Sequence, residues 1–171
     1  MNLAVPYFKQ LDNYSGTGWR ECFSSSCAML AAFYGKVKSD DEYNIRRARY
    51  GDTTSVTAQL LALKSYGLRP IFSRYGSRST IENYIKAGRP VAVGWLHKGF
   101  TYSPWGGGHW SVAIGSSKSH IVLHDPYGEP KVFTGGHIPF SSGAGIPCSW
   151  ANWKPRWCVE GDRSGWYVVC L

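Results

Sequence analysis

Helix signals fill the first half of this 171-residue sequence, and most strand signals follow in the second half. Capping residues, apolar spacings of three and four, and closing glycines predict helices over residues 22–34, 39–50, 54–66 and 79–87. Apolar runs predict strands over residues 68–73, 89–96, 109–115, 120–125 and 166–171, with a further short strand over 131–133. Helices followed by strands favour an α+β fold with an antiparallel sheet over alternating βαβ units. The length predicts a single domain over residues 1–171.

The first predicted helix carries a cysteine at its start. Apolar residues of the segment 23–34 share one helical face, and Gly35 occupies the position that ends a helix. Cys22 is therefore expected at the helix N-terminus, where unpaired N–H groups and the helix dipole favour a thiolate. Cys27 follows five residues later, about 140° around the helix, and is predicted to be a core residue. The placement of Cys22 suits a nucleophile.

A histidine and an aspartate are predicted at the same edge of the sheet. His109 begins one strand directly after Gly106-Gly107-Gly108, and Asp125 ends the next strand. A hairpin places the start of one strand opposite the end of the following strand, so the two side chains are expected to be neighbours. A cysteine hydrolase needs an imidazole beside the thiol and a third group that fixes the imidazole tautomer. Gln10, upstream of Cys22, offers an amide for an oxyanion hole shared with the Cys22 backbone N–H.

Four segments together resemble a known family. In chain order they are Val5–Gln10, the Cys22 helix through Gly35, Gly107–Val112 and His124–Gly128. The arrangement resembles the papain-like cysteine peptidases related to the bacteriocin-processing, double-glycine-leader peptidases, over residues 5–130. The resemblance implies a papain-like fold in which an N-terminal helical part carrying the nucleophile packs against a C-terminal antiparallel sheet.

The resemblance also implies a role for each matching residue. Cys22 is expected to be the nucleophile and His109 the base, with Asp125 orienting the base and Gln10 donating to the oxyanion. The chain departs from the family at Phe23-Ser24-Ser25, where the family usually has Gly-Pro-Thr or Gly-Pro-Ala. Phe23 is therefore expected to narrow the cleft or to change the substrate. No metal or organic cofactor is implied.

Charge and aromatic content guide the prediction of the substrate. A formal charge of +8 and eight tryptophans favour an enzyme that is attracted to an anionic bacterial cell wall. This prediction is a peptidoglycan hydrolase of the phage endolysin type, acting as an endopeptidase or amidase. Trp19 and Trp110 are the predicted substrate-binding residues, because aromatic rings stack on sugars and grip peptides.

Two other functions stay open at this stage. The first is a peptidase that processes a protein or a leader peptide after a small-residue motif. The second is a non-catalytic binding domain on a papain-like scaffold, which the departure at Phe23 favours. A nucleic-acid partner is not expected, because no recognition motif accompanies the basic charge. The expected partner is peptidoglycan or a peptide substrate. The protein is expected to be a monomer.

The sequence also suggests where the protein acts. It shows no secretory signal at residues 1–7 and no apolar run near the roughly 20 residues that a membrane helix needs. Cytoplasmic synthesis is expected, followed by action at the cell wall if the protein is an endolysin. Reduced thiols are favoured, although pairing is left open among Cys148, Cys158 and Cys170.

Some features of the second half are assigned no function. No partner is predicted for four histidines, which are interpreted as turn or surface residues: His97, His120, His124 and His137. Residues 141–165 are predicted to be irregular, because they are rich in Gly, Ser, Pro and Trp. Pro155 argues against one continuous helix through Trp150, Trp153 and Trp157.

Overall fold

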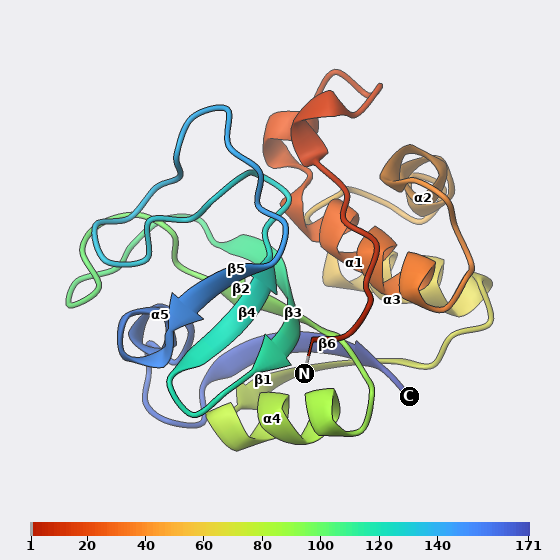
Figure 1. The fold of residues 1–171 in the computed structure, drawn as a ribbon. Helices are drawn as coiled ribbons and strands as arrows, with labels where there is room; N and C mark the ends of the chain where they lie inside the picture. The colour runs from red at the N-terminus through yellow and green to blue at the C-terminus, as the bar shows by residue number, and fades with distance from the viewer. Residues whose placement is uncertain (1) are drawn as a thin grey trace.

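The computed structural model describes residues 2–171 as one sheet with helices packed on both faces (Figure 1). The six strands are antiparallel and lie in the order β1-β6-β2-β3-β4-β5. Their bounds are β1 (Pro70–Gly76), β2 (Val91–Trp95), β3 (His109–Ser116), β4 (His120–His124), β5 (Ile146–Ser149) and β6 (Gly165–Cys170). The predicted α+β class with an antiparallel sheet is confirmed.

The helices divide into two groups. The first group is α1 (Cys22–Phe33), α2 (Asp40–Arg47) and α3 (Val56–Ser65), preceded by the short 3-10 turns η1 (Gln10–Asp12) and η2 (Gly18–Arg20). The second group is α4 (Arg78–Lys86) and α5 (Trp150–Trp157). In Figure 1, α1, α2 and α3 gather on the upper right of the sheet, whereas α4 and α5 lie below it and to its left.

The strands build a separate core on each face, because alternate side chains of a strand point in opposite directions. Ala92 and Val112 pack in one core with the buried residues of α1. Their neighbours Val91 and Ala113 pack in the other core with α4 and α5. The nearly continuous apolar character of β2 and β3 follows from this double burial.

Serine N-caps begin the helices α2, α3, α4 and α5. The predicted cap at Ser39 is confirmed, since its hydroxyl accepts from the Glu42 backbone N–H at 3.1 Å. The predicted start of α4 at Ser79 is wrong by two residues. Ser77 caps the helix instead, with Thr80 completing a capping box. Ser77 directly follows β1, so the helix begins as soon as the strand ends.

The region 141–165 is more regular than predicted, because it contains β5 and α5. Pro155 lies inside α5, near its C-terminal end, where the proline removes little of the helical hydrogen bonding. Trp150, Trp153 and Trp157 all point into the core, and the burial of three indole rings outweighs the cost of one proline. Residues 131–133 form no strand, so this prediction is also wrong.

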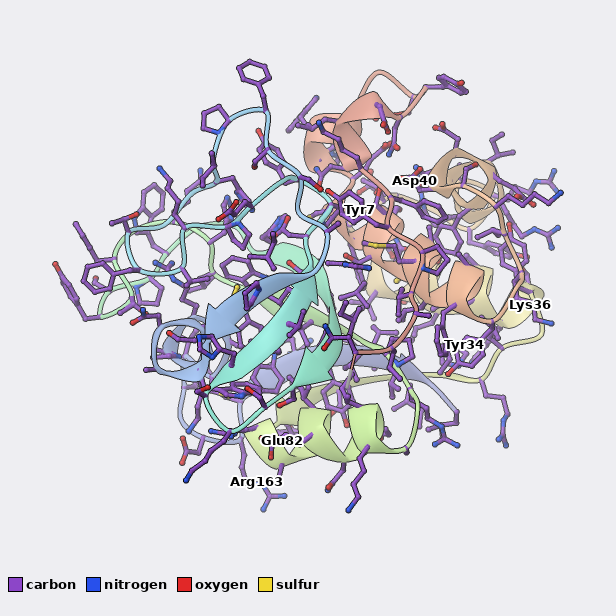
Figure 2. The ribbon with its side chains drawn as sticks, in the orientation of Figure 1. Tyr7, Tyr34, Lys36, Asp40, Glu82 and Arg163 are labelled. Carbon is purple, nitrogen blue, oxygen red and sulfur yellow. The ribbon has the colours of Figure 1, made fainter. Side chains whose placement is uncertain are left out.

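The N-terminal segment is tied to the loop that follows β4. The Tyr7 hydroxyl donates to the Asp125 backbone carbonyl at 3.0 Å and accepts from the Gly143 N–H at 3.0 Å. Figure 2 shows Tyr7 inside the molecule, while Lys36 and Arg163 project from its periphery. Over residues 2–171, the cysteine side chains are all free, and no helix combines the length and apolar character needed to cross a membrane.

Candidate active site

Helix α1 begins at Cys22, as the sequence predicts. The thiol is partly exposed, whereas the helix behind it is buried from residue 23 to residue 31. The residue before it, Glu21, is buried and accepts hydrogen bonds from Asn13 (2.7 Å), Ser15 (2.9 Å) and Thr17 (3.0 Å). These bonds hold the preceding loop against the start of α1, so Cys22 has a fixed position.

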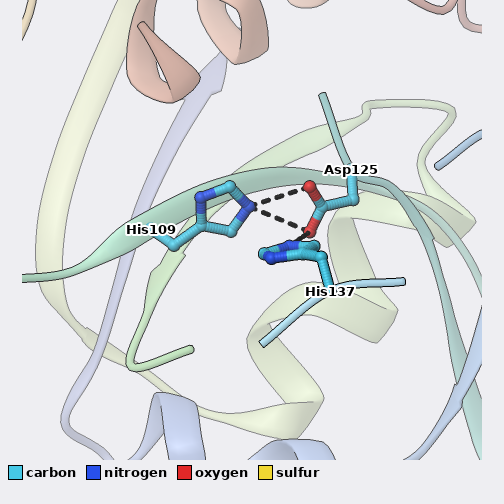
Figure 3. A group of neighbouring side chains, drawn as sticks. All are labelled: His109, Asp125 and His137. Atoms are coloured by element: carbon cyan, nitrogen blue, oxygen red, sulfur yellow. Dashed lines mark hydrogen bonds and ion pairs between the residues drawn. The ribbon is translucent and has the colours of Figure 1, made fainter. Parts of the chain in front are cut away.

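His109 and Asp125 are neighbours, which confirms the prediction from hairpin spacing. Strands β3 and β4 pair Val112 with His124, which brings the start of β3 beside the residue after β4. The His109 Nε2 atom lies 2.8 Å from Asp125 Oδ1 and 2.9 Å from Oδ2 (Figure 3). Gly108, at φ 91°, adopts a conformation that favours glycine and turns the chain into β3. Because Nε2 faces Asp125, Nδ1 is the ring nitrogen left for other chemistry.

The Asp125 carboxylate is fully buried and accepts further hydrogen bonds. Oδ1 accepts from the Tyr127 backbone N–H at 2.9 Å, and Oδ2 accepts from the Ser111 hydroxyl at 3.0 Å. Trp95 Nε1–H donates in turn to the Ser111 oxygen at 3.0 Å. A buried carboxylate with this many donors is held in one orientation.

Burial and charge act in opposite directions on this pair. Burial lowers the pKa of His109, but the negative charge and hydrogen bonds of Asp125, together with Cys22, outweigh it and raise the pKa to about 10. Burial raises the pKa of Asp125, but the charge and hydrogen bonds of His109 and His137 outweigh it and hold the pKa well below its usual value. The two groups therefore form an ion pair at neutral pH.

The ion pair predicts how stability depends on pH. The His109 contribution is complete below pH 6.5 and is lost as pH rises through about 10, because its folded-state pKa is raised. The Asp125 contribution is present above pH 3.8 and is lost as pH falls, because its folded-state pKa is lowered. We expect the Tm difference between wild type and Asp125→Asn to be largest between pH 3.8 and 6.5 and to shrink toward pH 10. Thermal unfolding over this pH range measures it; a constant difference would mean that Asp125 acts through packing alone.

A cleft of about 880 Å³ runs between the start of α1 and the start of β3. The six residues singled out by the sequence divide between its lining and its support. Five of them line it: Gln10, Trp19, Cys22, His109 and Trp110. Asp125 lies behind His109 and does not reach the cleft surface. The structure therefore brings the predicted site residues together around one cavity.

Gln10 is buried beside the cleft in η1. Its Nε2 atom donates to the Gly18 carbonyl at 2.7 Å, which joins η1 to η2. A side-chain amide carries two N–H groups, so one hydrogen of Nε2 is left for a ligand. The arrangement is compatible with the predicted donation to an oxyanion.

Phe23 supports one wall of the cleft. Its ring stacks on Trp110 with 3.8 Å between centroids and 7° between planes. The Trp110 ring also covers Gly94, where a Cβ atom would lie 2.9 Å from it. The large residue after Cys22 is thus matched by a large aromatic residue on β3, and both residues line the cleft.

Two of the histidines interpreted as turn or surface residues lie near the site. The interpretation is wrong for His137, whereas His97 lies in the loop after β2 and is only half-buried. His137 Nε2 lies 3.2 Å from Asp125 Oδ2 (Figure 3), and its side chain is only 7% exposed. His97 lines the cleft, with 5.3 Å between the centroids of its ring and the His109 ring. Burial, together with the charge of His109, lowers the pKa of His97 to about 4. One sequence signal was available, because the tripeptide Gly-Gly-His occurs at both 107–109 and 135–137.

The remaining two histidines differ from each other. His120 is exposed, as predicted. His124 is buried, contrary to the prediction: its Nε2 lies 2.9 Å from the Val5 carbonyl, and its Nδ1 accepts from the Gly145 N–H at 2.8 Å. Both ring nitrogens are engaged with the backbone, so His124 connects the N-terminal segment to β4 and has no free nitrogen for chemistry.

One group near the site has the composition of a metal centre. Ligand atoms of His109, Asp125 and His137 all lie within 4.8 Å of one another. The nitrogen–oxygen separations of 2.8–3.2 Å are hydrogen-bond lengths, and each imidazole can donate its Nε2–H to the carboxylate. The group is therefore satisfied as a hydrogen-bonded cluster.

Comparison with known proteins identifies what this arrangement resembles. A family model described as "Peptidase_C39 like family" matches residues 2–137. No curated protein sequence matches the chain. Among solved structures, a C39-like peptidase from Bacillus anthracis has a TM-score of 0.68 at 14% identity, covering 100% of this chain and 98% of that chain.

Two further structures share the fold. The peptidase domain of Streptococcus ComA, a bi-functional ABC transporter involved in a quorum-sensing pathway, has a TM-score of 0.61 at 17% identity and covers 97% of this chain and 98% of that chain. A double-glycine-motif protease from an AMS/PCAT transporter, in complex with a leader peptide, has a TM-score of 0.57 at 17% identity. This likeness covers 99% of this chain and 93% of that chain. The papain-like fold predicted from the sequence is confirmed by these likenesses.

Proposed function

This chain belongs to the peptidase C39-like family, and we propose that it is a cysteine peptidase whose nucleophile is the Cys22 thiol. The observation that carries the proposal is the common cleft. Cys22 at the start of α1 and His109 at the start of β3 line the same cavity, and Asp125 holds His109 from behind. Family membership alone leaves the reacting residues unassigned, and the shared cleft together with the His109–Asp125 contact supports these proposed roles.

The proposed reaction follows from the placement of the groups. The Cys22 proton passes to His109 Nδ1, and this proton makes the ring the imidazolium that pairs through Nε2–H with Asp125. The Cys22 sulfur then attacks the peptide carbonyl carbon as a thiolate. The Gln10 amide and the Cys22 backbone N–H donate to the oxygen that becomes negative. His109 returns the proton to the leaving amine, so the peptide bond breaks and a thioester remains. Water attacks this thioester, with His109 taking one proton from it, and releases the acid and the free thiol.

We propose that the substrate is a peptide segment of another protein. A neighbour of similar fold was solved with a leader peptide bound, and another is the peptidase domain of a transporter. Peptidoglycan, the substrate favoured by the net charge, finds no counterpart among these neighbours. The processing-peptidase alternative is therefore better supported than the endolysin prediction.

The substrate class can be tested by offering both polymers to one enzyme preparation. Wild-type protein is incubated with a library of unmodified peptides and, separately, with purified peptidoglycan, and new amino termini are identified by mass spectrometry. Cleavage of peptides at recurring sites supports the proposal. Release of new amino groups from peptidoglycan, with no cleavage of the peptides, would instead support the cell-wall hydrolase prediction. A preparation that cleaves neither substrate, with a Cys22 thiol no more reactive than free cysteine, would favour the binding-domain alternative.

Trp19 is proposed to bind the substrate from the rim of the cleft. Its indole lies in η2 and is 69% exposed, so it packs against little of the protein. We expect Trp19→Ala to raise KM by about 2- to 10-fold with little change in kcat, since stacking on an exposed aromatic ring contributes about 0.5–1.5 kcal/mol. Steady-state kinetics on a cleaved peptide measure the two constants.

Tyr14 offers a matched control for this prediction. Tyr14 lies in the loop just before η2 and is 93% exposed, but it does not line the cleft. Tyr14→Ala is expected to leave both constants unchanged. An equal effect of the two substitutions on KM would show that the loop as a whole matters, and not contact with Trp19.

A further inference from the structure

Two imidazoles share the Asp125 carboxylate. His109 contacts both oxygens, at 2.8 and 2.9 Å, while His137 approaches Oδ2 at 3.2 Å from below in the view of Figure 3. The proposed reaction uses His109 and leaves His137 without a task. The side chain of His137 is only 7% exposed and contacts Asp125 directly, so its position requires an explanation of its own.

The position of His137 is well determined by its surroundings. Its ring packs against His109 and Tyr127, each with 4.9 Å between centroids. The backbone is fixed on both sides, because Gly136 N–H donates to the His97 carbonyl at 2.6 Å and Ile138 N–H donates to the Glu129 carbonyl at 2.9 Å. The contact with Asp125 is therefore a built part of the site.

The Asp125 carboxylate needs support on both oxygens to face His109 squarely. Oδ1 is held by the Tyr127 N–H, and Oδ2 is held by the Ser111 hydroxyl and by His137. The His109 Nε2 atom lies almost equally far from the two oxygens, a geometry that a rotation of the carboxylate would destroy. Loss of the His137 donor leaves Oδ2 with Ser111 and His109 as its partners, so the carboxylate is held less tightly against such a rotation and a buried acceptor is less satisfied.

We propose that His137 is a positioning residue for the peptidase reaction. Its Nε2–H donates to Asp125 Oδ2 and fixes the carboxylate, which in turn fixes the His109 ring toward Cys22. This inference rests on the proposed function. His137 also belongs to the segment 136–140, which lines the cleft, so the same hydrogen bond joins one cleft wall to the residue that orients the base.

Two substitutions separate donation from packing. His137→Leu keeps apolar bulk but removes the donor, whereas His137→Gln keeps an N–H group close to the position of Nε2. His120→Ala is the control, because His120 is exposed at the start of β4. We measure kcat and KM on a cleaved peptide, the rate of Cys22 alkylation by iodoacetamide, and Tm for each variant.

The expected result is a loss of kcat that the glutamine variant restores. His137→Leu should lower kcat by about 10- to 100-fold, the effect of a displacement of about 1 Å in a catalytic site, with KM within about twofold of wild type. His137→Gln should recover kcat to within about fivefold of wild type, since its amide replaces the lost donor. Cys22 alkylation should slow in the leucine variant and recover in the glutamine variant, because iodoacetamide is too small to depend on the cleft wall.

Three outcomes would overturn the proposal. Wild-type kcat in both variants would show that the contact is dispensable. Equal loss in both, with KM raised and alkylation unchanged, would assign His137 to the cleft wall. Loss of wild-type activity in EDTA, with recovery on adding Zn²⁺, would make the cluster a metal site. If wild type cleaves no peptide, the proposed function fails, but the alkylation rates of the three proteins still decide the task of His137.

Discussion

Replacing Cys22 with alanine is expected to abolish peptide hydrolysis and to leave the fold intact. The thiol is the proposed nucleophile, and no other cysteine lines the cleft in the part of the chain that the structure describes. Removing the nucleophile of a peptidase lowers kcat by on the order of 10⁴-fold or more, because the remaining groups act as a unit with it. The stability should change by less than about 0.5 kcal/mol, since Cys22 is partly exposed and alanine is a good helix former.

Cys27→Ala is the matched control for this experiment. Cys27 lies on the same helix, but its side chain is completely buried in the core behind the site. Its substitution should lower Tm slightly and keep kcat near the wild-type value. Both variants are compared by peptide cleavage and by thermal unfolding. Retention of more than about 1% of activity in Cys22→Ala would rule out the thioester route, because such a loss is far smaller than removal of a nucleophile causes.

The largest effect on stability is expected for Arg156→Met. Arg156 lies in α5 and is fully buried, yet its hydrogen bonds go to backbone carbonyls instead of a carboxylate. Its guanidinium donates to five of them, on two loops that are distant in sequence: Leu96, Lys98, Gly99, Val132 and Phe133. Burial lowers the pKa of Arg156. A buried carbonyl that loses its donor costs about 1–3 kcal/mol, so we expect a loss of at least about 3 kcal/mol.

The same substitution should reach the candidate site. The two loops that Arg156 joins lead to His97 on one side and to His137 on the other. For a chain of this length, about 3 kcal/mol lowers Tm by about 10 °C. Thermal unfolding measures this loss, and amide hydrogen exchange should show faster exchange in residues 96–99 and 131–137. Arg163→Met, at a position that projects from the periphery (Figure 2), should change Tm little. Equal Tm values for the two variants would show that the hydrogen bonds from Arg156 to the two loops do not stabilise the fold.

Local signals in the sequence predict the elements that carry Cys22, His109 and Asp125. Helix α1 begins at Cys22 because the apolar period and Gly35 act within one short segment. The contact between His109 and Asp125 follows from the hairpin of β3 and β4, whose partners are close in the chain. In both cases the determining interactions lie within about twenty residues, a range over which pattern and spacing are informative.

The missed features depend on contacts that are distant in the chain. Helix α5 continues through Pro155 because its tryptophans are buried against the sheet, which the local sequence does not reveal. Strand β5 forms by pairing with β4 across a long loop. His137 reaches Asp125 only because its loop is held by Arg156 and by the His97 carbonyl. Such placements are set by tertiary packing and not by propensity.

The strand order has a consequence for synthesis of the protein. Strand β6 lies between β1 and β2 in the sheet. Strands β1 and β2 follow each other in the sequence, but they do not pair with each other directly. On the ribosome, Cys22 and His109 emerge long before residues 165–170 are available to join the sheet. Trp166 of β6 is itself part of the cleft lining. The nascent chain therefore exposes Cys22, the proposed nucleophile, before the cleft is complete. The cleft receives its full lining only after β6 has been translated and inserted between β1 and β2.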